Sequence, residues 1–176
     1  KLTDQFVDIV EQGIDIALRI GVLKNSSLIA KKIAPIRLAV FASPAYLKQH
    51  GTPTTLQELQ QHNYLRYANA EPTKRLTGVN ELKSEFKLES NLVANNGDLL
   101  LNTAIAGGGI AMQPTFIAGE ALAQGKVVRI LQNHEPEPMG LYMVYANRQF
   151  LPSKVRAFVD FTSGYYGDVP YWDLGE

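Results

Sequence analysis

The feature that most constrains this chain is a repeated change in the spacing of its apolar residues. A period of two, typical of a strand with one buried face, relates Ile14, Ile16, Leu18 and Ile20. Similar short strands are indicated over 28–33, 37–42, 64–67, 86–94, 110–112, 127–131 and 141–145. Helix start signals fall between many of them. This alternation predicts an α/β fold of packed layers with a mostly parallel sheet.

Several helices are predicted from their first residues. Ser43 followed by Pro44 is a strong start, because a hydroxyl can cap and proline suits the first helical position. The segment 55–58 (TLQE) fits a capping box, and Asn96, Pro114 and Pro152 each precede an apolar run.

The first residues predict a short helix that stops at Gly13. Phe6, Ile9 and Val10 lie at helical spacing on one side of this segment, and polar residues surround them. An isolated helix of this size is not stable in water, so its apolar stripe must pack against the core or a partner.

Composition excludes several classes of protein. The 176 residues carry 17 Lys and Arg against 17 Asp and Glu, and this zero net charge argues against nucleic-acid binding by the chain alone. Cysteine is absent, which excludes a disulfide framework and a thiolate metal site. No apolar run approaches the roughly 18–20 residues of a membrane span, so no membrane contact is expected.

The motifs of common catalytic sites are absent from the sequence. The three histidines have no partner at metal-ligand spacing, and neither a nucleophile elbow nor a phosphate-binding loop occurs. We therefore expect no metal, no cofactor and no enzymatic activity.

The segment Asn95–Asp98 is the first candidate site. A strand that leads directly into a helix presents free N–H groups and the positive end of the helix dipole, which suit a carboxylate or phosphate. The alternative is local: Asn96 caps its own helix, and Asp98 complements the dipole.

Arg19 is a second candidate, near the carboxyl end of its strand. Ligands of open α/β sheets bind at such strand ends, and an arginine suits an anionic group. The alternative is a solvated charge or a structural pair with Asp15, four residues earlier on the same face.

Two changes of composition suggest two lobes. They lie at Ser43–Pro44 and over residues 133–138, so the chain would enter a second lobe at the first and leave it at the other. The expected division is residues 1–42 and 132–166 for the first lobe, 43–131 for the second, and 167–176 for a tail. A cleft between two lobes is a usual place for a small ligand.

Ordered segments from residue 7 to about 162 resemble the effector-binding domain of LysR-type transcriptional regulators. They are residues 7–21 (VDIVEQGIDIALRIG), 26–33 (SSLIAKKI), 42–47 (ASPAYL), 51–53 (GTP), 95–98 (NNGD), 106–111 (AGGGIA), 126–131 (KVVRIL) and 152–161 (PSKVRAFVDF). The resemblance implies the two-lobed fold of type 2 periplasmic binding proteins, with mixed sheets in three-layer α/β lobes joined by two crossovers.

The same resemblance implies a cytoplasmic sensor that binds a small-molecule effector between its lobes. By motif, the effector site would include Arg19, Gly21, Ser43, Asn95, Asn96, Gly97, Asp98 and Gln113. Family members pair their sensor domains, so Phe6, Ile9 and Val10 would contact the partner in a homodimer or homotetramer.

The resemblance also implies a piece of a longer regulator. The helix-turn-helix that would contact DNA and the first strands of the sensor have no counterpart here, so the first lobe is expected to be incomplete. A solute-binding protein of a transporter, which shares the fold, is the alternative.

Overall fold

The computed structural model describes residues 9–21, 28–70, 76–79, 86–146 and 152–173. They form two compact units, which are described separately below. The first unit contains the described residues up to Ile36 and from Pro138 to Asp173, and the second contains Arg37–Glu137. These boundaries differ from the expected divisions at 42/43 and 131/132, because residues 38–42 form a strand of the second unit's sheet.

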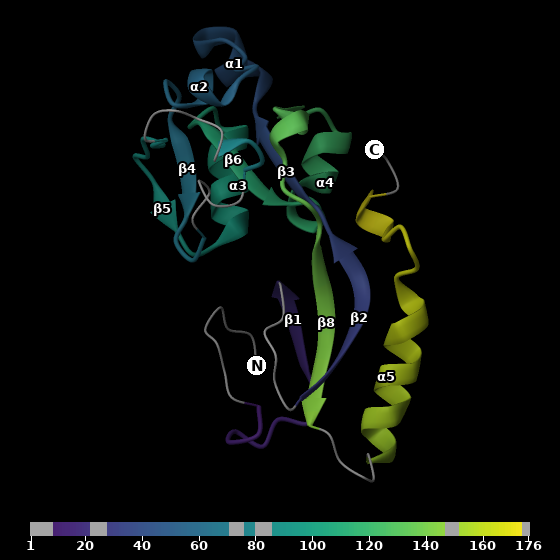
Figure 1. The fold of residues 1–176 in the computed structure, drawn as a ribbon. Helices are drawn as coiled ribbons and strands as arrows, with labels where there is room; N and C mark the ends of the chain where they lie inside the picture. Colours follow the sequence, from purple (N-terminus) through teal and green to yellow (C-terminus); the bar gives the residue numbers. More distant parts are fainter. Residues whose placement is uncertain (1–8, 22–27, 71–75, 80–85, 147–151, 174–176) are drawn as a thin grey trace. The chain divides into compact units, whose positions relative to one another are not determined.

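The first unit is built on a three-stranded antiparallel sheet in the order β1-β8-β2 (Figure 1). Its strands are β1 (Ala17–Gly21), β2 (Leu28–Ile36) and β8 (Met139–Ala146). The strand expected over 28–33 extends to Ile36, so β2 continues through Pro35, with a register shift between Lys32 and Ala34. Proline is tolerated there because β2 is an edge strand, so it needs hydrogen bonds on one side only.

Helix α5 (Ser153–Tyr165) packs on one face of this sheet. Val155 and Val159 are buried with Leu141 and Met143 of β8. Phe158, which lies between these two valines on the helix, is 43% exposed.

The strand β1 differs from its sequence pattern. Leu18 and Ile20 are 50% and 45% exposed, although the alternation predicted that they would be buried. They lie in register with Met143 and Leu141, which are buried in the core formed by α5 and the strands β2 and β8. Because β1 is the other edge of the sheet, its apolar face is not covered by the described residues.

The second unit contains a five-stranded sheet in the order β5-β4-β6-β3-β7. The strands are β3 (Leu38–Ala42), β4 (Tyr64–Tyr67), β5 (Val93–Ala94), β6 (Ile110–Pro114) and β7 (Val128–Ile130). β4 runs parallel to β5 and β6, whereas β3 runs antiparallel to β6 and β7. The expectation of a mostly parallel sheet is therefore wrong for the described strands; a mixed sheet is confirmed in the second unit, whereas the described sheet of the first unit is antiparallel. The strand expected over 86–94 is limited to β5.

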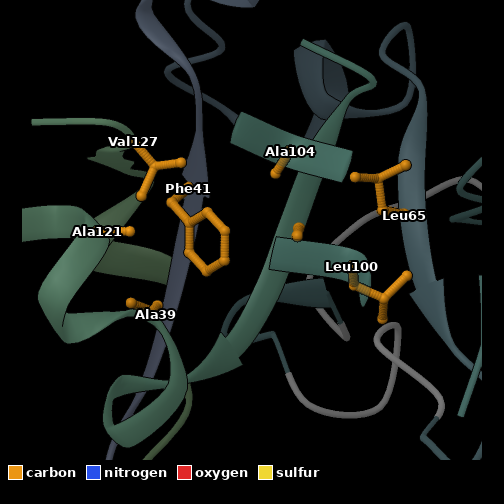
Figure 2. Packing of buried hydrophobic residues seen from close by; sticks show 9 residues of the cluster. Ala39, Phe41, Leu65, Leu100, Ala104, Ala121 and Val127 are labelled. Carbon is orange, nitrogen blue, oxygen red and sulfur yellow. The ribbon is translucent and has the colours of Figure 1, made fainter. Parts of the chain in front are cut away.

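Four helices belong to the second unit: α1 (Pro44–His50), α2 (Leu56–Leu59), α3 (Gly97–Ile105) and α4 (Thr115–Ala123). Its core joins Phe41 and Leu65 of the sheet to Leu100 and Ala104 of α3 (Figure 2). Val127, just before β7, packs in the same cluster. This packing holds α3 against the sheet, and thereby positions the helix start that the sequence singled out.

The predicted helix caps of α1 and α2 are confirmed. Ser43 Oγ accepts a hydrogen bond from the Tyr46 N–H at 3.3 Å, and Thr55 Oγ1 accepts one from the Glu58 N–H at 3.2 Å. The Glu58 carboxylate departs from a standard capping box, because it accepts from the N–H of Thr54, at 2.7 Å, rather than from that of the cap residue.

A partly buried ion pair ties the end of the second unit to its sheet. Glu135 accepts hydrogen bonds from Arg129 Nε at 2.9 Å and from Arg129 Nη2 at 2.6 Å. One of its oxygens also accepts from the Val40 N–H of β3 at 3.2 Å. The side chains of Arg129 and Glu135 are only 22% and 10% exposed, so this contact is well shielded from solvent.

No helix within the described ranges is long and apolar enough to cross a membrane.

Candidate functional site

The start of α3 is held by its cap residue. Asn96 has extended backbone, and its Oδ1 accepts a hydrogen bond from the Leu99 N–H at 2.9 Å. The local interpretation of Asn96 as a cap is therefore confirmed. The first N–H groups of a helix have no partner inside it, so those of Gly97 and Asp98 point out of the helix end. Asp98 is exposed in this first turn.

Gly97 allows the start of α3 to approach β6 and α4 closely. A Cβ at position 97 would lie 2.6 Å from Ile117 Cδ1 and 2.9 Å from Gln113 Oε1. These separations are far below normal van der Waals contact, so only glycine fits without a shift of its neighbours. The helix end and the Gln113 side chain therefore meet directly.

Gln113 is a buried residue of this region whose side-chain amide lacks a hydrogen-bond partner for its nitrogen within the described part of the chain. It lies on β6 opposite Ala39 of β3 and is only 3% exposed. Its Nε2 has no hydrogen-bond partner among the described residues. Leaving a buried donor unpaired costs about 1–3 kcal/mol, so a native sequence rarely retains one without a function.

Ile117 was not singled out by the sequence, yet it forms the third side of this contact. It lies in the first turns of α4, whose start is fixed by a hydrogen bond from the Thr115 N–H to the Arg37 carbonyl at 3.0 Å. The one sequence signal that could have identified Ile117 is its position four residues after Gln113, across the junction between β6 and α4.

Ser43 does not belong to this cluster. It is 2% exposed, and its hydroxyl caps α1. A Cβ at Gly107, beyond the carboxyl end of α3, would lie 3.9 Å from Ser43 Oγ. The nine residues of α3 therefore separate Ser43 from Gly97, which is about 13 Å at the usual rise. Ser43 therefore lies near the opposite end of α3 from Asn95–Asp98, and its place in the effector site stays a prediction.

Arg19 and Gly21 lie in the first unit, on β1. Arg19 is opposite Tyr142 of β8, and Gly21 is opposite Gly140. The Tyr142 ring covers Gly140 so closely that any side chain there would collide with it. Arg19 is half-buried on this face, which is the face opposite to α5. Asp15, its alternative partner, makes an ion pair with Lys154 of α5, with Oδ2 to Nζ at 2.6 Å.

The predicted partner-binding stripe is only partly described. Phe6 lies outside the described residues. Residues 9–13 form hydrogen-bonded turns rather than helix, including a bond from the Ile14 N–H to the Ile9 carbonyl at 2.9 Å. Ile9 is 1% exposed and Val10 is 62% exposed, so within the described stripe only Val10 offers surface to a partner.

A buried polar cluster around Tyr46 lies next to α1. The Tyr46 hydroxyl accepts from the Asn63 N–H at 3.1 Å and lies 3.2 Å from His62 Nδ1. Burial lowers the pKa of His62, and the charge of His50 lowers it further. Burial likewise raises the pKa of Tyr46. A neutral His62 can accept a hydrogen bond at Nδ1 from the Tyr46 hydroxyl, so we assign this cluster a structural role.

A hollow of about 340 Å³ lies elsewhere on the second unit, away from the predicted site residues. It is lined by the polar residues 60–63 and 89–91. Asn63 Nδ2 donates to Asn91 Oδ1 at 2.8 Å, and the Asn91 N–H donates to Asn63 Oδ1 at 3.1 Å. These bonds join the two lining segments, which gives the hollow a structural explanation. Within the described part of the chain, no group of three His, Cys, Asp or Glu residues could hold a metal ion.

Comparison with known proteins places this geometry in a family context. The model of the LysR substrate binding domain matches residues 1–165. An uncharacterised HTH-type transcriptional regulator of Haemophilus influenzae is 40% identical over 157 residues, which cover 88% of this chain and 54% of that protein. The probable HTH-type transcriptional regulator LtrA of Klebsiella pneumoniae is 33% identical over 167 residues, covering 93% of this chain and 54% of LtrA.

Solved structures of LysR-type regulators are similar to this chain as well. The CrgA regulatory domain, from a LysR-type transcriptional regulator of Neisseria meningitidis, superposes with a TM-score of 0.76 at 27% identity, over 92% of this chain and 79% of that domain. Full-length AphB, a virulence activator of Vibrio cholerae, gives a TM-score of 0.74 at 30% identity, over 94% of this chain and 56% of AphB.

These relatives are transcriptional regulators rather than transport receptors, which favours the first of the two functions inferred from the sequence. The chain spans about half the length of the curated relatives it matches. With a family model that matches almost its whole length, the chain belongs to the LysR substrate-binding domain family and is an effector-binding domain of the LysR type.

Proposed function

We propose that this chain senses a small molecule for a cytoplasmic DNA-binding transcriptional regulator, and that the effector binds where α3 begins. Its contacts would be Asn95, Asn96, Gly97, Asp98 and Gln113. The observation that carries this placement is the side chain of Gln113: its buried amide nitrogen has no partner in the described residues, and its amide oxygen lies against the glycine at the helix start.

The chemistry of this position suits a ligand with hydrogen-bond acceptors. The helix N–H groups and Gln113 Nε2 are all donors, and the helix dipole adds positive potential. A carboxylate group meets these requirements. Asp98 is an acceptor at the edge of the same turn, so an effector with a hydroxyl or amine beside its carboxylate would satisfy both.

Arg19 and Gly21 remain proposed contacts from the first unit, where a guanidinium would pair with an anionic group. Ser43 is left out of the proposed site, because its hydroxyl already caps α1. The parent regulator is proposed to form a homodimer or homotetramer and to contact DNA through a helix-turn-helix. We also propose that the chain binds without catalysing a reaction, and that effector binding shifts a conformational equilibrium.

The site is tested with a panel of small carboxylic and hydroxycarboxylic acids, each measured by titration calorimetry. Compounds that bind the native chain should bind Gly97→Val and Gln113→Leu at least tenfold more weakly. Ser43→Ala is the matched control, and it should retain affinity. Ligands whose affinity is unchanged in both site variants would refute the placement.

The regulatory function is tested by deleting the gene that encodes this chain. Transcript levels from particular promoters should change, and the native gene should restore them. If no transcript responds in any condition in which the gene is expressed, the regulator function is wrong.

A further inference from the structure

His62 has two different polar environments within reach. It follows α2 in the second unit, is only 9% exposed, and its Nδ1 lies 3.2 Å from the Tyr46 hydroxyl of α1. The ring of His50, in the last turn of α1, stacks on the Tyr46 ring with centroids 4.5 Å apart. His62 also lines the polar hollow of about 340 Å³ described above. Its side chain can therefore bond the tyrosine or turn into the hollow.

The Tyr46 hydroxyl suits a neutral His62 and not a protonated one. It accepts from the Asn63 N–H at 3.1 Å, so its own proton is available for an unprotonated Nδ1. Among the described residues this hydroxyl has no other hydrogen-bond partner. A protonated imidazole carries a hydrogen on both ring nitrogens, so Nδ1 would become a donor and the tyrosine proton would lose its acceptor.

The charges around His62 favour its departure once it is protonated. Burial lowers the pKa of His62 most, and the charge of His50 lowers it further. Glu58 of α2 acts in the opposite direction, but its carboxylate is exposed and already held by hydrogen bonds at the start of its own helix. Glu89 lines the hollow together with His62, and Lys87 lies two residues before it; both are exposed. The hollow thus offers an imidazolium both water and an acidic residue.

Asn63 connects this contact to other parts of the second unit. Its backbone carbonyl accepts from the Ile110 N–H at 2.9 Å, and its side-chain amide donates to the Gly108 carbonyl. A Cβ at Gly109 would lie 2.5 Å from the Asn63 carbonyl oxygen, so the turn after α3 packs directly on this residue. The hydrogen bond between Asn63 and Tyr46 therefore ties α1 to that turn and to the start of β6.

We propose that His62 is a proton-driven switch: the neutral side chain holds the Tyr46 hydroxyl, and the protonated side chain turns into the hollow toward Glu89 and loosens the tie between α1 and Asn63. Once His62 leaves, the tyrosine hydroxyl is a buried donor without an acceptor, and it regains a hydrogen bond only by moving toward water. That movement lengthens its bond to the Asn63 N–H. The proposal is independent of the effector site, because none of these residues belongs to it.

The side-chain movement is tested by a pH titration of the native chain, followed by NMR. The chain contains three histidines, so each imidazole can be resolved and assigned with single His→Gln variants. Neutral His62 should carry its proton on Nε2 and give a nuclear Overhauser contact to the Tyr46 ring. As the pH falls from 7.5 to 5, contacts to Glu89 or Ser90 should replace it, in step with protonation of His62.

Hydrogen exchange at the Asn63 N–H tests the loosened tie. After correction for the intrinsic rate, this amide should exchange about fivefold faster at pH 5 than at pH 7.5. The buried Leu100 of α3 reports global unfolding, and the exchange of its N–H should change less. His62→Gln should abolish the pH dependence at Asn63. His134→Gln is the matched control and should preserve it, because His134 bonds the Thr77 carbonyl instead.

Two charge variants should shift the titration midpoint of His62 in opposite directions. His50→Gln removes a like charge and should raise the midpoint, because the repulsion that opposes protonation is lost. Glu89→Gln removes the acidic residue of the hollow and should lower it, because the protonated side chain loses its partner there.

Three results would overturn the proposal. The first is that His62 becomes protonated while its contact to the Tyr46 ring persists. The second is that exchange at Asn63 follows exchange at Leu100 at every pH, which would mean that acid acts only through global unfolding. The third is that the pH dependence at Asn63 is the same in His62→Gln as in the native chain.

Discussion

The contact between Gly97 and Ile117 gives the sharpest quantitative prediction. In Gly97→Ala, the new Cβ would lie 2.6 Å from Ile117 Cδ1, about 1 Å inside normal carbon–carbon contact. Overpacking of this kind costs about 1–3 kcal/mol, and the lower end is expected because Cδ1 is the free end of a side chain. Replacing glycine by alanine at a compatible helical position gains about 0.4–1 kcal/mol. The net loss in the free energy of unfolding should therefore be below about 1 kcal/mol.

A double-mutant cycle separates these opposing contributions. Ile117→Val removes the Cδ1 atom and should itself cost about 0.5–1 kcal/mol. In the Ile117→Val background, Gly97→Ala should cost less, because only the 2.9 Å approach to Gln113 Oε1 remains, which gives a coupling of about 1 kcal/mol. The free energies are measured by urea unfolding followed by circular dichroism.

Ile105→Val is the matched control for this cycle. Ile105 lies at the far end of α3, so its effect should add to that of Gly97→Ala within about 0.5 kcal/mol. If the Ile117 cycle is also additive, or if Gly97→Ala stabilises the native chain by 1 kcal/mol, the close approach at the helix start is wrong.

Three further predictions concern stability. Gln113→Leu should raise the free energy of unfolding by about 1 kcal/mol in urea melts, because it removes a buried unpaired donor. Glu135→Ala should lower it by about 3 kcal/mol, since Arg129 and the Val40 N–H lose their acceptor. For His62, the depressed pKa means that the unfolded chain binds protons more readily, so stability should fall as pH drops below 6.5. The slope between pH 7 and pH 5 should be smaller in His62→Gln.

Each of these has a result that contradicts it. A destabilised Gln113→Leu would mean that the amide is satisfied in solution. For the ion pair, Glu135→Gln is the control because it keeps the shape and removes the charge, and a Glu135→Gln variant as stable as the native chain would show that shape rather than charge matters. A His62→Gln variant with an unchanged pH slope would assign the acid sensitivity to other groups.

The start of α3 could be predicted because its signals are local. Asn96, Gly97 and the following apolar run lie within one stretch of sequence, and a cap acts within three residues. The same holds for Ser43 and Thr55. By contrast, the meeting of Gly97 with Gln113 and Ile117 depends on how β6 and α4 pack against α3. No local pattern carries that information.

The exposure of Leu18 and Ile20 on β1 shows a second limit of prediction from sequence. Alternation identified Leu18 and Ile20 as one face of a strand, and that is their geometry. Whether the face is covered depends on the position of α5, which packs over the other two strands. Pro35 shows the same dependence, because a proline breaks a central strand but is compatible with an edge.

The order β1-β8-β2 has a consequence for biosynthesis. The central strand, β8, begins at Met139, whereas the two strands that flank it end by Ile36. About 100 residues must be translated between them, which takes roughly 5–20 s at typical rates of chain growth. During that interval β1 and β2 lack β8, the strand that pairs with both of them.

The sheet of the second unit, by contrast, is formed from one continuous segment of the chain. All five strands of its sheet lie between residues 38 and 130, so it can fold while the ribosome is still producing the rest. The first unit must wait for β8. A released fragment that ends before Met139 should therefore already contain a protease-resistant second unit, while residues 28–36 remain open to cleavage.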